Sequence, residues 1–279
     1  MHRIDSHTQL VGVLGYPVRH SLSPVMHNAA FRALELNWVY LAFEVAPEAL
    51  PHAIAGMRAL GIRGLNLTIP HKQAVIPLLD GLTEAAQQIG AVNTLFWDNG
   101  RLIGDNTDAE GFWRALREAD IDPTGQTVLV LGAGGAARAV VYALRQHGCQ
   151  VFIANRTHAR AIELANAFGA NATPLDKLAH VLAQVAGIVN CTALGMEPEA
   201  HHAPPITWEC VPPTAWVCDL VYRPLHTRFL QQAQARGLKA VDGLGMLVHQ
   251  GALALERWTG RSAPIAVMRE AVIAHLTHS

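Results

Sequence analysis

Two ionisable residues in the N-terminal part of the chain occupy positions suited to acid–base chemistry. Lys72 comes directly after a predicted strand, in the first turn of a predicted helix. The helix dipole disfavours a positive charge there, so the position favours a lysine that exchanges protons. Asp108 stands at the start of another predicted helix, where a carboxylate can also serve as an N-terminal cap. Taken alone, the pattern around Asp108 favours capping over catalysis.

A glycine-rich loop in the middle of the chain has the pattern of a dinucleotide-binding site. The motif G-x-G-x-x-A falls on Gly132, Gly134 and Ala137, directly after the apolar run 127–131 and before an Ala- and Val-rich helix. In this arrangement backbone N–H groups at the helix N-terminus can bind a pyrophosphate. The alternative is a turn whose glycines serve only close helix packing. The expected cofactor contacts in the loop are Gly132, Ala133, Gly134, Gly135 and Ala136.

The residues after the next predicted strand indicate which dinucleotide is bound. That strand ends at Ala154, about 20 residues beyond the loop, where such folds read the adenosine ribose. Asn155, Arg156 and Thr157 follow, with Arg160 one helical turn later and no carboxylate. A carboxylate would accept hydrogen bonds from a free 2′-hydroxyl, whereas a guanidinium pairs with a 2′-phosphate. NADP(H) is therefore favoured over NAD(H), although Arg156 could also be a solvated loop cation.

The N-terminal segments that carry Lys72 and Asp108 alternate between strand-like and helix-like patterns. The order strand-helix-strand-helix-strand favours a parallel sheet. Ser21 and Ser23 are predicted to supply hydroxyl N-caps for the first helix, and Pro24 suits its first turn. The predicted strands are residues 10–15, 38–43, 64–69, 94–97 and 101–104, the last two forming a hairpin, and the predicted helices are residues 21–36, 51–60, 71–79, 83–89 and 105–119.

A second module begins after the linker-like residues 121–125, Ile-Asp-Pro-Thr-Gly. Strands and helices alternate there too, which again predicts an α/β fold. The predicted strands are residues 127–131, 151–154, 187–191 and 216–220. The predicted helices are one that follows the glycine loop and ends at Gln146, and residues 159–168, 227–236, 247–258 and 264–275. The last two helices have no strand partner after them, so we expect them to pack on the first module.

The composition supports a globular protein of about two domains. The chain has 279 residues, and about 150 residues are typical of one domain. Hydrophobic residues make up 51% and charged residues 15%, which provides enough apolar surface for full cores. The formal net charge is −1 without a block of like charges, which argues against nucleic acid and membrane surfaces as partners.

The sequence predicts neither a membrane segment nor a metal site. Arg138 interrupts the most apolar stretch, residues 128–144, and the N-terminus lacks the apolar core of a signal peptide. We therefore expect a cytoplasmic protein whose 4 cysteines are reduced. The 15 histidines show no H-x-x-x-H or H-E-x-x-H spacing, so no metal is expected.

The segments described above resemble the shikimate dehydrogenase family over nearly the whole chain. The resemblance is specific because separate blocks occur in the same order. They are Gly-Tyr-Pro at 15–17, His-Ser-Leu-Ser-Pro at 20–24, Met-His-Asn at 26–28, Asn-Leu-Thr-Ile-Pro-His-Lys at 66–72, Gly-Ala-Val-Asn-Thr at 90–94, Gly-Asp-Asn-Thr-Asp at 104–108, the glycine loop at 132–137, Asn-Arg-Thr at 155–157 and Gly-Leu-Gly-Met-Leu-Val-His-Gln at 243–250.

The resemblance implies reversible oxidation of the 3-hydroxyl of shikimate to 3-dehydroshikimate with NADP+, a step towards chorismate and the aromatic amino acids. It implies that Lys72 and Asp108 are the catalytic pair. A small polyhydroxylated anion offers little apolar area, so convergent polar groups must hold it. The implied contacts are Ser21 and Ser23 to the carboxylate, Thr68, Asn93 and Gln250 to the ring hydroxyls, and Tyr222. Without the family, helix capping explains Ser21 and Ser23 equally well.

The family layout also implies the domain organisation. It assigns residues 1–108 and 244–279 to a substrate-binding catalytic domain and residues 109–243 to an NADP-binding Rossmann domain. The expected fold class is α/β, with a mainly parallel sheet in the substrate-binding domain. The implied cofactor contacts outside the glycine loop are Asn155, Arg156, Thr157, Arg160 and Gly243. The expected assembly is a monomer or homodimer.

Three residues depart from the family pattern, and two functions other than shikimate dehydrogenase are considered. Cys191, Ala193 and Arg223 stand where the family commonly has other residues, which bears only on the lining of the nicotinamide pocket. A relative that also oxidises quinate, often with NAD, is the closest rival, and Arg156 disfavours its NAD use. A catalytically silent NADP-binding regulator should lack Lys72 or Asp108, and both are present.

Overall fold

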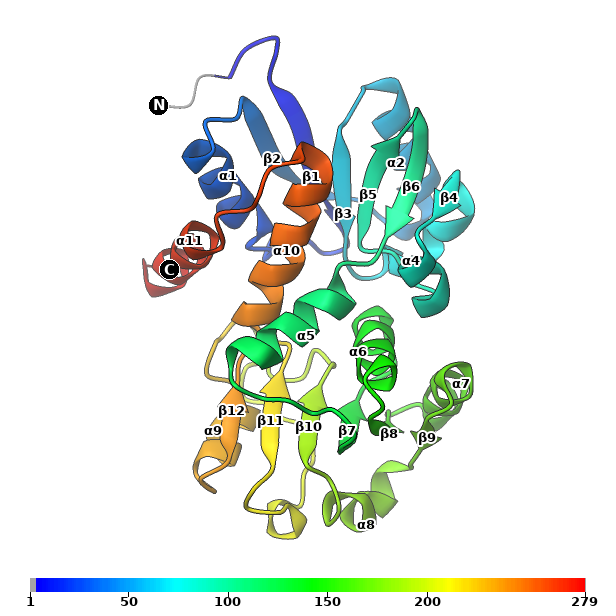
Figure 1. Cartoon of the computed structure of the whole chain (residues 1–279), viewed down its shortest axis with the longest axis vertical. Helices are drawn as coiled ribbons and strands as arrows, with labels where there is room; N and C mark the ends of the chain where they lie inside the picture. The colour runs from blue at the N-terminus through cyan, green and yellow to red at the C-terminus, as the bar shows by residue number, and fades with distance from the viewer. Residues whose placement is uncertain (1–3, 279) are drawn as a thin grey trace. The chain divides into compact units, whose positions relative to one another are not determined.

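Two six-stranded sheets form the framework of the protein, whose computed structural model describes residues 4–278 (Figure 1). Each sheet belongs to a separate compact unit. The first unit contains the chain up to Gly111 and the segment from Val248 onward, and the second runs from Phe112 to Leu247. Both units combine strands with helices, so the predicted α/β fold class is confirmed.

The sheet of the first unit is mixed, in the order β2-β1-β3-β5-β6-β4. β1 pairs in parallel with β2 and β3, and β4 pairs in parallel with β6. β5 runs antiparallel to both of its neighbours, and its turn into β6 has positive φ at Asn99 and Gly100, as the predicted hairpin requires. The strands are β1 Gln9–Gly15, β2 Trp38–Glu44, β3 Gly64–Leu67, β4 Gly81–Leu82, β5 Thr94–Asp98 and β6 Arg101–Asp105.

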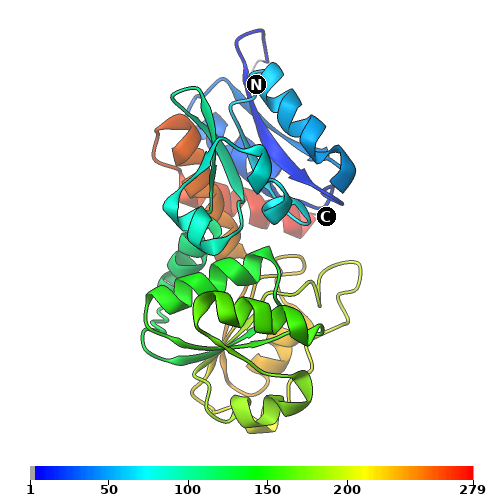
Figure 2. The same cartoon turned by 90° about the vertical axis from the view of Figure 1, so that its right-hand side faces the viewer.

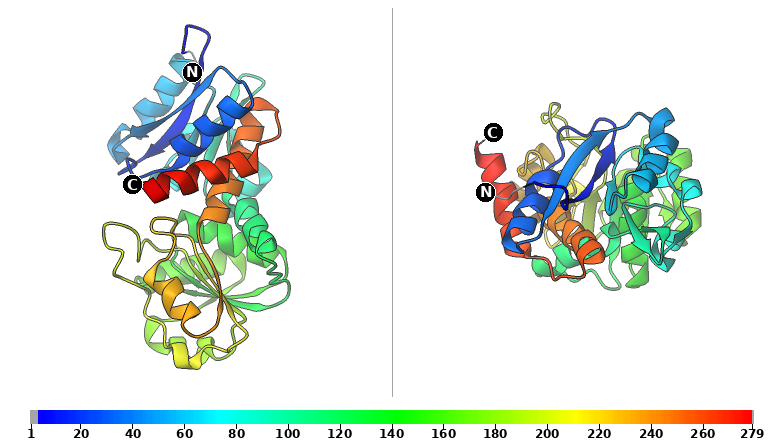
Figure 3. Two further views of the ribbon diagram at one scale, coloured as in Figure 1. Left: turned by 90° about the vertical axis from the view of Figure 1, so that its left-hand side faces the viewer. Right: turned by 90° about the horizontal axis from the view of Figure 1, so that it is seen from above.

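Helices cover this sheet, and the chain's last two helices are among them. α2 buries Leu50, Ile54 and Met57 in a core shared with Leu65 and Leu67 of β3. α11 packs beside α1, as Figure 3 shows, which confirms that the C-terminal segment returns to the first unit. The helices of this unit are α1 Ser23–Ala33, α2 Leu50–Ala59, α3 His71–Ala74, α4 Glu84–Ile89 and α11 Ile265–His278, with 3₁₀ turns η1 Pro47–Ala49 and η2 Ile76–Leu78. α5 Asp108–Glu118 and α10 Leu244–Thr259 each contain residues of both units.

Two helix predictions in the first unit were wrong in detail. Leu22 occupies the cap position of α1 and its side chain makes no capping bond, while of the two predicted hydroxyls only Ser21 Oγ accepts from a backbone N–H at the helix start, that of Ser23. α1 also ends before residue 36, because Glu35 has a left-handed backbone with φ of 54°. The predicted helix 71–79 divides into α3 and η2, since Pro77 has no N–H to continue an α-helix.

The second unit contains an all-parallel sheet with strand order β12-β11-β10-β7-β8-β9. Counted from the first strand of the unit, this is the doubly wound order of dinucleotide-binding domains, and the order reverses between β7 and β10. Helices cover both faces of the sheet (Figure 2). The elements are β7 Thr127–Leu131, α6 Gly135–Gln146, β8 Gln150–Ala154, α7 His158–Phe168, β9 Asn171–Ala172, η3 Leu175–Lys177, α8 Leu178–Leu182, β10 Gly187–Asn190, η4 Trp208–Cys210, β11 Trp216–Asp219, α9 Arg228–Gln234 and β12 Lys239–Val241.

The described helices include none long and apolar enough to cross a membrane.

The predicted strands of the second unit are all present, and the edge strands β9 and β12 were not predicted. These two strands are only two or three residues long. Strands this short carry no periodic pattern that sequence analysis can detect.

Candidate active site

One edge of the first unit's sheet carries most of the predicted catalytic and substrate-binding residues. Thr68 directly follows β3, and Asp108 lies just beyond β6. Asn93 directly precedes β5, whose antiparallel direction brings its start to the edge where β3 and β6 end. Because β5 is antiparallel, the residue before it, Asn93, lies at the same edge as the residues that follow β3 and β6. The site therefore combines residues from the start of one strand with residues from the ends of two others.

Lys72 and Asp108 form a buried ion pair at this edge. Lys72 Nζ donates to Asp108 Oδ2 at 2.6 Å, and the side chains are only 14% and 6% exposed. α3, which carries Lys72, is a single turn, so its dipole is small and the neighbouring carboxylate dominates the environment of the ammonium group. Limited exposure to water strengthens such a charge-assisted contact.

Asn106, rather than Asp108, provides the bonds that cap α5. Asn106 Oδ1 accepts from the backbone N–H of Asp108 at 3.1 Å and of Ala109 at 3.3 Å. The carboxylate of Asp108 instead accepts from Lys72 and, through Oδ1, from Asn93 Nδ2 at 2.9 Å. The Asp108 carboxylate is therefore not needed as a cap for α5.

The side-chain amide of Asn93 has a fixed orientation. The backbone N–H of Thr107 can only donate, and it donates to Asn93 Oδ1 at 2.8 Å. The amide nitrogen must then face the other way, where it lies 2.9 Å from Asp108 Oδ1 and 3.3 Å from Gln250 Oε1 of α10. The structure thus brings together Lys72, Asn93, Asp108 and Gln250 from four separate elements.

Asn93 is also held by a chain of buried hydrogen bonds that begins at Tyr40. Sequence analysis did not identify these residues. Tyr40 Oη donates to Asn66 Oδ1 at 2.8 Å, and Asn66 Nδ2 donates to Thr94 Oγ1 at 3.1 Å. Thr94 Oγ1 in turn donates to Asn93 Oδ1 at 3.0 Å. His27 stacks on Tyr40 with ring centroids 4.4 Å apart, and burial lowers the pKa of His27 to about 3, so the ring is uncharged. An asparagine inside the apolar strand β3 was the one available signal.

We expect Tyr40→Phe to lower the free energy of unfolding by about 1–3 kcal/mol, because it leaves Asn66 Oδ1 buried without its donor. Urea unfolding followed by tryptophan fluorescence measures this loss. Tyr142→Phe is the matched control, since Tyr142 is only half-buried on α6 and should change stability by less than about 0.5 kcal/mol. Equal stability of the two variants would show that the hydroxyl of Tyr40 does not support the site.

Ser21, Ser23 and Thr68 lie at the same edge without joining this cluster. Ser21 Oγ accepts from the backbone N–H of Ser23 at 3.3 Å, and Ser23 is 7% exposed at the first position of α1. Within residues 4–278, no hydrogen bond links these two serines or the half-buried Thr68 to Lys72 or Asp108. Their hydroxyl groups leave hydrogen-bonding capacity for a ligand.

The predicted glycine loop lies at the point where the strand order of the second sheet reverses. Gly132 has φ of 112°, and a Cβ there would lie 3.2 Å from the Cys191 carbonyl carbon, so both backbone and space favour glycine. Gly134 precedes α6 and is exposed, and a Cβ on it would have no atom of the described chain within 4 Å. Ala137 is fully buried and packs α6 on the sheet. The loop therefore presents open backbone at a helix N-terminus.

The predicted ribose-binding residues follow β8 at the same edge of the second sheet. Asn155 Nδ2 donates to the Thr157 carbonyl at 2.9 Å, which shapes the turn. Arg156, Thr157 and Arg160 are exposed, and neither arginine has an ion pair within the described chain. The same described residues contain no group of His, Cys, Asp and Glu that could hold a metal ion.

Tyr222 and Gly243 also belong to the second unit. Asp219, at the end of β11, accepts from the backbone N–H of Val221 at 3.1 Å and so anchors the segment that leads to the half-buried Tyr222. Burial raises the pKa of Asp219 to about 6. A Cβ at Gly243 would lie 2.4 Å from the Leu220 carbonyl oxygen, so only glycine fits there.

The three departures from the family pattern have separate surroundings. Arg223 Nε pairs with Glu197 Oε2 at 2.7 Å near the surface. Cys191 follows β10, and burial raises the pKa of its thiol. Ala193 is exposed in the turn after it. Cys149, Cys191, Cys210 and Cys218 are all free thiols in the structure.

Comparison with known proteins identifies relatives across both units. Three family models match: the shikimate dehydrogenase substrate binding domain over residues 13–95, shikimate/quinate 5-dehydrogenase over residues 115–197, and the shikimate 5′-dehydrogenase C-terminal domain over residues 243–273. A shikimate dehydrogenase (NADP+) from Carboxydothermus hydrogenoformans is 47% identical, with 97% of this chain and 98% of the relative covered.

Solved structures agree in fold at similar identity. A shikimate dehydrogenase in complex with NADP+ has a TM-score of 0.93 and 42% identity, covering 98% of each chain. The Thermus thermophilus enzyme in complex with NADP(H) and shikimate has a TM-score of 0.88 and 45% identity, covering 95% of this chain and 99% of its own. A quinate dehydrogenase from Corynebacterium glutamicum in complex with NAD is less similar, at 34% identity and a TM-score of 0.87 over 96% of this chain and 99% of its own. The chain belongs to the shikimate dehydrogenase family.

Proposed function

We propose that this protein catalyses the reversible, NADP(H)-dependent interconversion of 3-dehydroshikimate and shikimate, a step towards chorismate and the aromatic amino acids. The observation that carries the proposal is the contact of 2.6 Å between Lys72 Nζ and Asp108 Oδ2 at a sheet edge lined by polar side chains. Family membership gives this pair its substrate class. A regulator without activity would be expected to have lost Lys72 or Asp108, and both are present and paired.

In this mechanism Lys72 transfers the proton and Asp108 positions the groups between which it moves. In reduction, the Lys72 ammonium gives a proton from Nζ to the 3-keto oxygen as a hydride arrives at the same carbon. In oxidation, the neutral amine takes the hydroxyl proton back. Asp108 accepts a hydrogen bond from that hydroxyl and holds Lys72 Nζ beside it, while the NH₂ of Asn93 keeps the carboxylate in position.

The remaining polar residues at the edge would hold the substrate. Ser21 and Ser23 bind the carboxylate, and Thr68, Asn93 and Gln250 bind ring hydroxyls, because their donors and acceptors supply the directed contacts that a small polyol requires. The role of Tyr222 in substrate binding rests on the family resemblance. The corresponding domains are residues 1–108 and 244–279 for substrate and residues 109–243 for NADP. The cytoplasmic location and the monomeric or homodimeric state stay predictions.

The residues of the second unit fit NADP(H). Gly134 and the first turn of α6 offer open backbone N–H groups for the pyrophosphate, and Gly132 lets the chain pass close to β10. Exposed Arg156 and Arg160 have charge available for the 2′-phosphate, with Asn155 and Thr157 beside them. The residues proposed to hold the cofactor are Gly132, Ala133, Gly134, Gly135, Ala136, Asn155, Arg156, Thr157, Arg160 and Gly243. When bound, the nicotinamide supplies or accepts the hydride.

Arg156→Ala is expected to weaken NADP+ binding by about 10- to 150-fold, since a charge-assisted hydrogen bond is worth roughly 1.5–3 kcal/mol. NAD+ has no 2′-phosphate, so its binding should change little. The measurement is kcat/KM for both cofactors, with Arg236→Ala as a control for loss of a distant surface arginine. A preference for NADP+ that falls less than severalfold would mean that other residues bind the phosphate.

A substrate panel tests the proposed function against its rivals. Formation of reduced nicotinamide is followed by absorbance with shikimate or quinate, each with NADP+ or NAD+. The proposal predicts the highest kcat/KM for shikimate with NADP+. A higher value for quinate with NAD+ would favour the quinate-oxidising rival, and nucleotide binding without turnover on any substrate would favour the silent regulator.

A further inference from the structure

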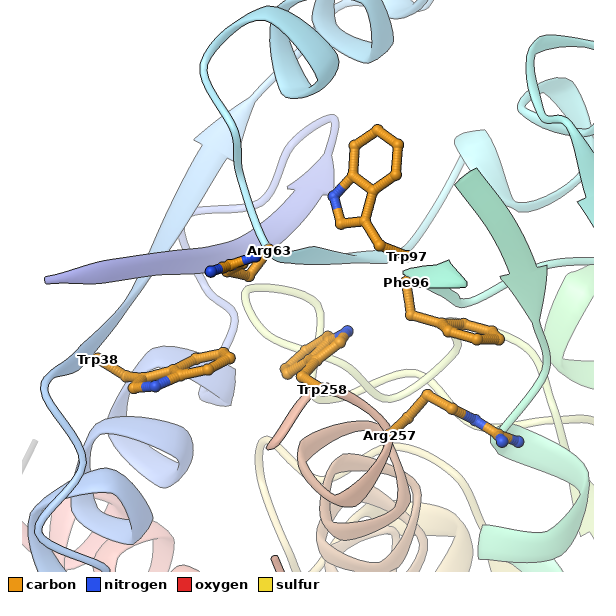
Figure 4. Close-up of a pocket in the computed structure, with 6 residues that line it drawn as sticks. All are labelled: Trp38, Arg63, Phe96, Trp97, Arg257 and Trp258. Carbon is orange, nitrogen blue, oxygen red and sulfur yellow. The ribbon is translucent and has the colours of Figure 1, made fainter. Parts of the chain in front are cut away.

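A pocket in the first unit is lined by residues of β2, β5 and α10 and by Arg63, which lies before β3 (Figure 4). Trp38 is the first residue of β2, and Arg63 directly precedes β3, so both mark the starts of parallel strands. The cavity has a volume of about 260 Å³. Its lining residues are Trp38, Arg63, Phe96, Trp97, Arg257 and Trp258. We propose that this pocket binds a small planar carboxylate, with a single aromatic or conjugated ring.

Two of the four aromatic side chains that line the pocket are held in place by hydrogen bonds to the backbone. Trp97 Nε1 donates to the Ile62 carbonyl at 2.8 Å, and Trp258 Nε1 donates to the Leu95 carbonyl at 2.9 Å. The absence of a side chain at Gly64 makes room for Trp258, because a Cβ there would lie 2.1 Å from Nε1. With the indole N–H groups of Trp97 and Trp258 already bonded, these two rings offer apolar surface that suits a flat partner.

The charge of the pocket favours an anion. Arg63 Nε donates to the neutral Gln9 side chain, and no carboxylate of the described chain pairs with Arg63. Arg257, by contrast, is paired with Asp105 at 2.7 Å and lies over the Phe96 ring. No lining residue is acidic. Arg63 therefore brings one uncompensated positive charge, and a guanidinium can bind a carboxylate with two parallel hydrogen bonds.

The volume of the pocket suits a ligand of about one ring. Pockets for drug-sized molecules typically measure about 300–1,000 Å³, and this cavity is smaller at about 260 Å³. Figure 4 shows the rings of Trp38 and Trp258 and the side chain of Arg63 around the same space. A planar ring can stack on an indole while its carboxylate reaches the guanidinium, whereas a puckered ring makes poorer face contacts.

Benzoate is the probe for a direct binding test. The protein is titrated with benzoate in the presence of saturating shikimate, and tryptophan fluorescence is recorded, since three of the 6 tryptophans line the pocket. We expect saturable quenching, with clearly weaker binding of cyclohexanecarboxylate, which is not planar, and of benzamide, which has no charge. Calorimetric titration under the same conditions gives the stoichiometry, which should be one site per chain.

Substitutions of the lining residues test whether benzoate binds in this pocket. Arg63→Gln should weaken benzoate binding about tenfold or more through loss of the charged contact, and Trp38→Leu should weaken it through loss of stacking. Arg236→Gln, a substitution of an exposed arginine in the second unit, should bind benzoate like the unsubstituted protein. Circular dichroism and the Tm check that each variant is folded. Absence of saturable binding, equal affinity in Arg63→Gln, or benzoate binding only when shikimate is omitted would overturn the proposal.

Discussion

Replacing Lys72 by alanine is expected to lower kcat by about 10²- to 10⁴-fold and to change KM much less, because general acid–base catalysis contributes about that much. Lys72 Nζ lies 2.6 Å from Asp108 Oδ2 and the Lys72 side chain is 14% exposed. The other two lysines, Lys177 and Lys239, belong to the second unit. Steady-state rates with shikimate and NADP+ measure the loss. A kcat within a few-fold of the unsubstituted enzyme would contradict proton transfer by this residue.

Two further variants separate chemistry from stability. The alanine variant leaves the buried Asp108 carboxylate without its cation, which can destabilise the protein. Lys72→Arg keeps a positive charge beside Asp108 but cannot release its proton near neutral pH, so the fold should persist while kcat stays low. Lys177→Ala, at an exposed lysine of the second unit, should leave kcat unchanged.

Asp108→Asn is expected to reduce kcat by about 10²-fold or more, because an amide can neither hold the Lys72 ammonium by charge nor stabilise its positive form. Asparagine caps helices as well as aspartate does, and Asn106 already provides the capping bonds of α5. The helix cap should therefore persist in this variant, but the Lys72 ammonium loses its anion, so circular dichroism and the Tm must show that the protein is folded. A fully active Asp108→Asn enzyme would assign the carboxylate a structural role only.

Asn106→Ala is the matched control for Asp108→Asn. It removes the cap and should lower the free energy of unfolding by about 0.5–2 kcal/mol. The loss in kcat should be smaller than in Asp108→Asn, since the Asp108 side chain keeps its contacts with Lys72 and Asn93. The two variants together distinguish a helix-capping position from a catalytic one.

The order of the elements could be predicted because each main element has a strong local pattern. β7 is a short apolar run that leads into Gly132, and the turn at Asn99 and Gly100 has residues that accept positive φ. The end of α1 could not be predicted from Glu35, which shows no preference for a left-handed conformation. Likewise, β4, β9 and β12 exist only through pairing with distant strands.

The candidate site was predictable in part. Local sequence identified Lys72 and the glycine loop, but the contact between Lys72 and Asp108 joins residues 36 positions apart and depends on how β3 and β6 share one edge. The support of Asn93 by Asn66 and Thr94 depends on the antiparallel register that places Asn66 opposite Thr94. Such partners follow from tertiary pairing, which a single sequence does not display.

Chemical rescue of Lys72→Ala tests the central claim most directly. The claim is that the ε-amino group of Lys72 carries the proton, so a small amine that diffuses into the vacated space should restore part of the rate. We predict that kcat of Lys72→Ala with shikimate and NADP+ rises with methylamine concentration, while kcat of the unsubstituted enzyme and of Asp108→Asn does not. An unchanged kcat of Lys72→Ala across the methylamine series would contradict the claim.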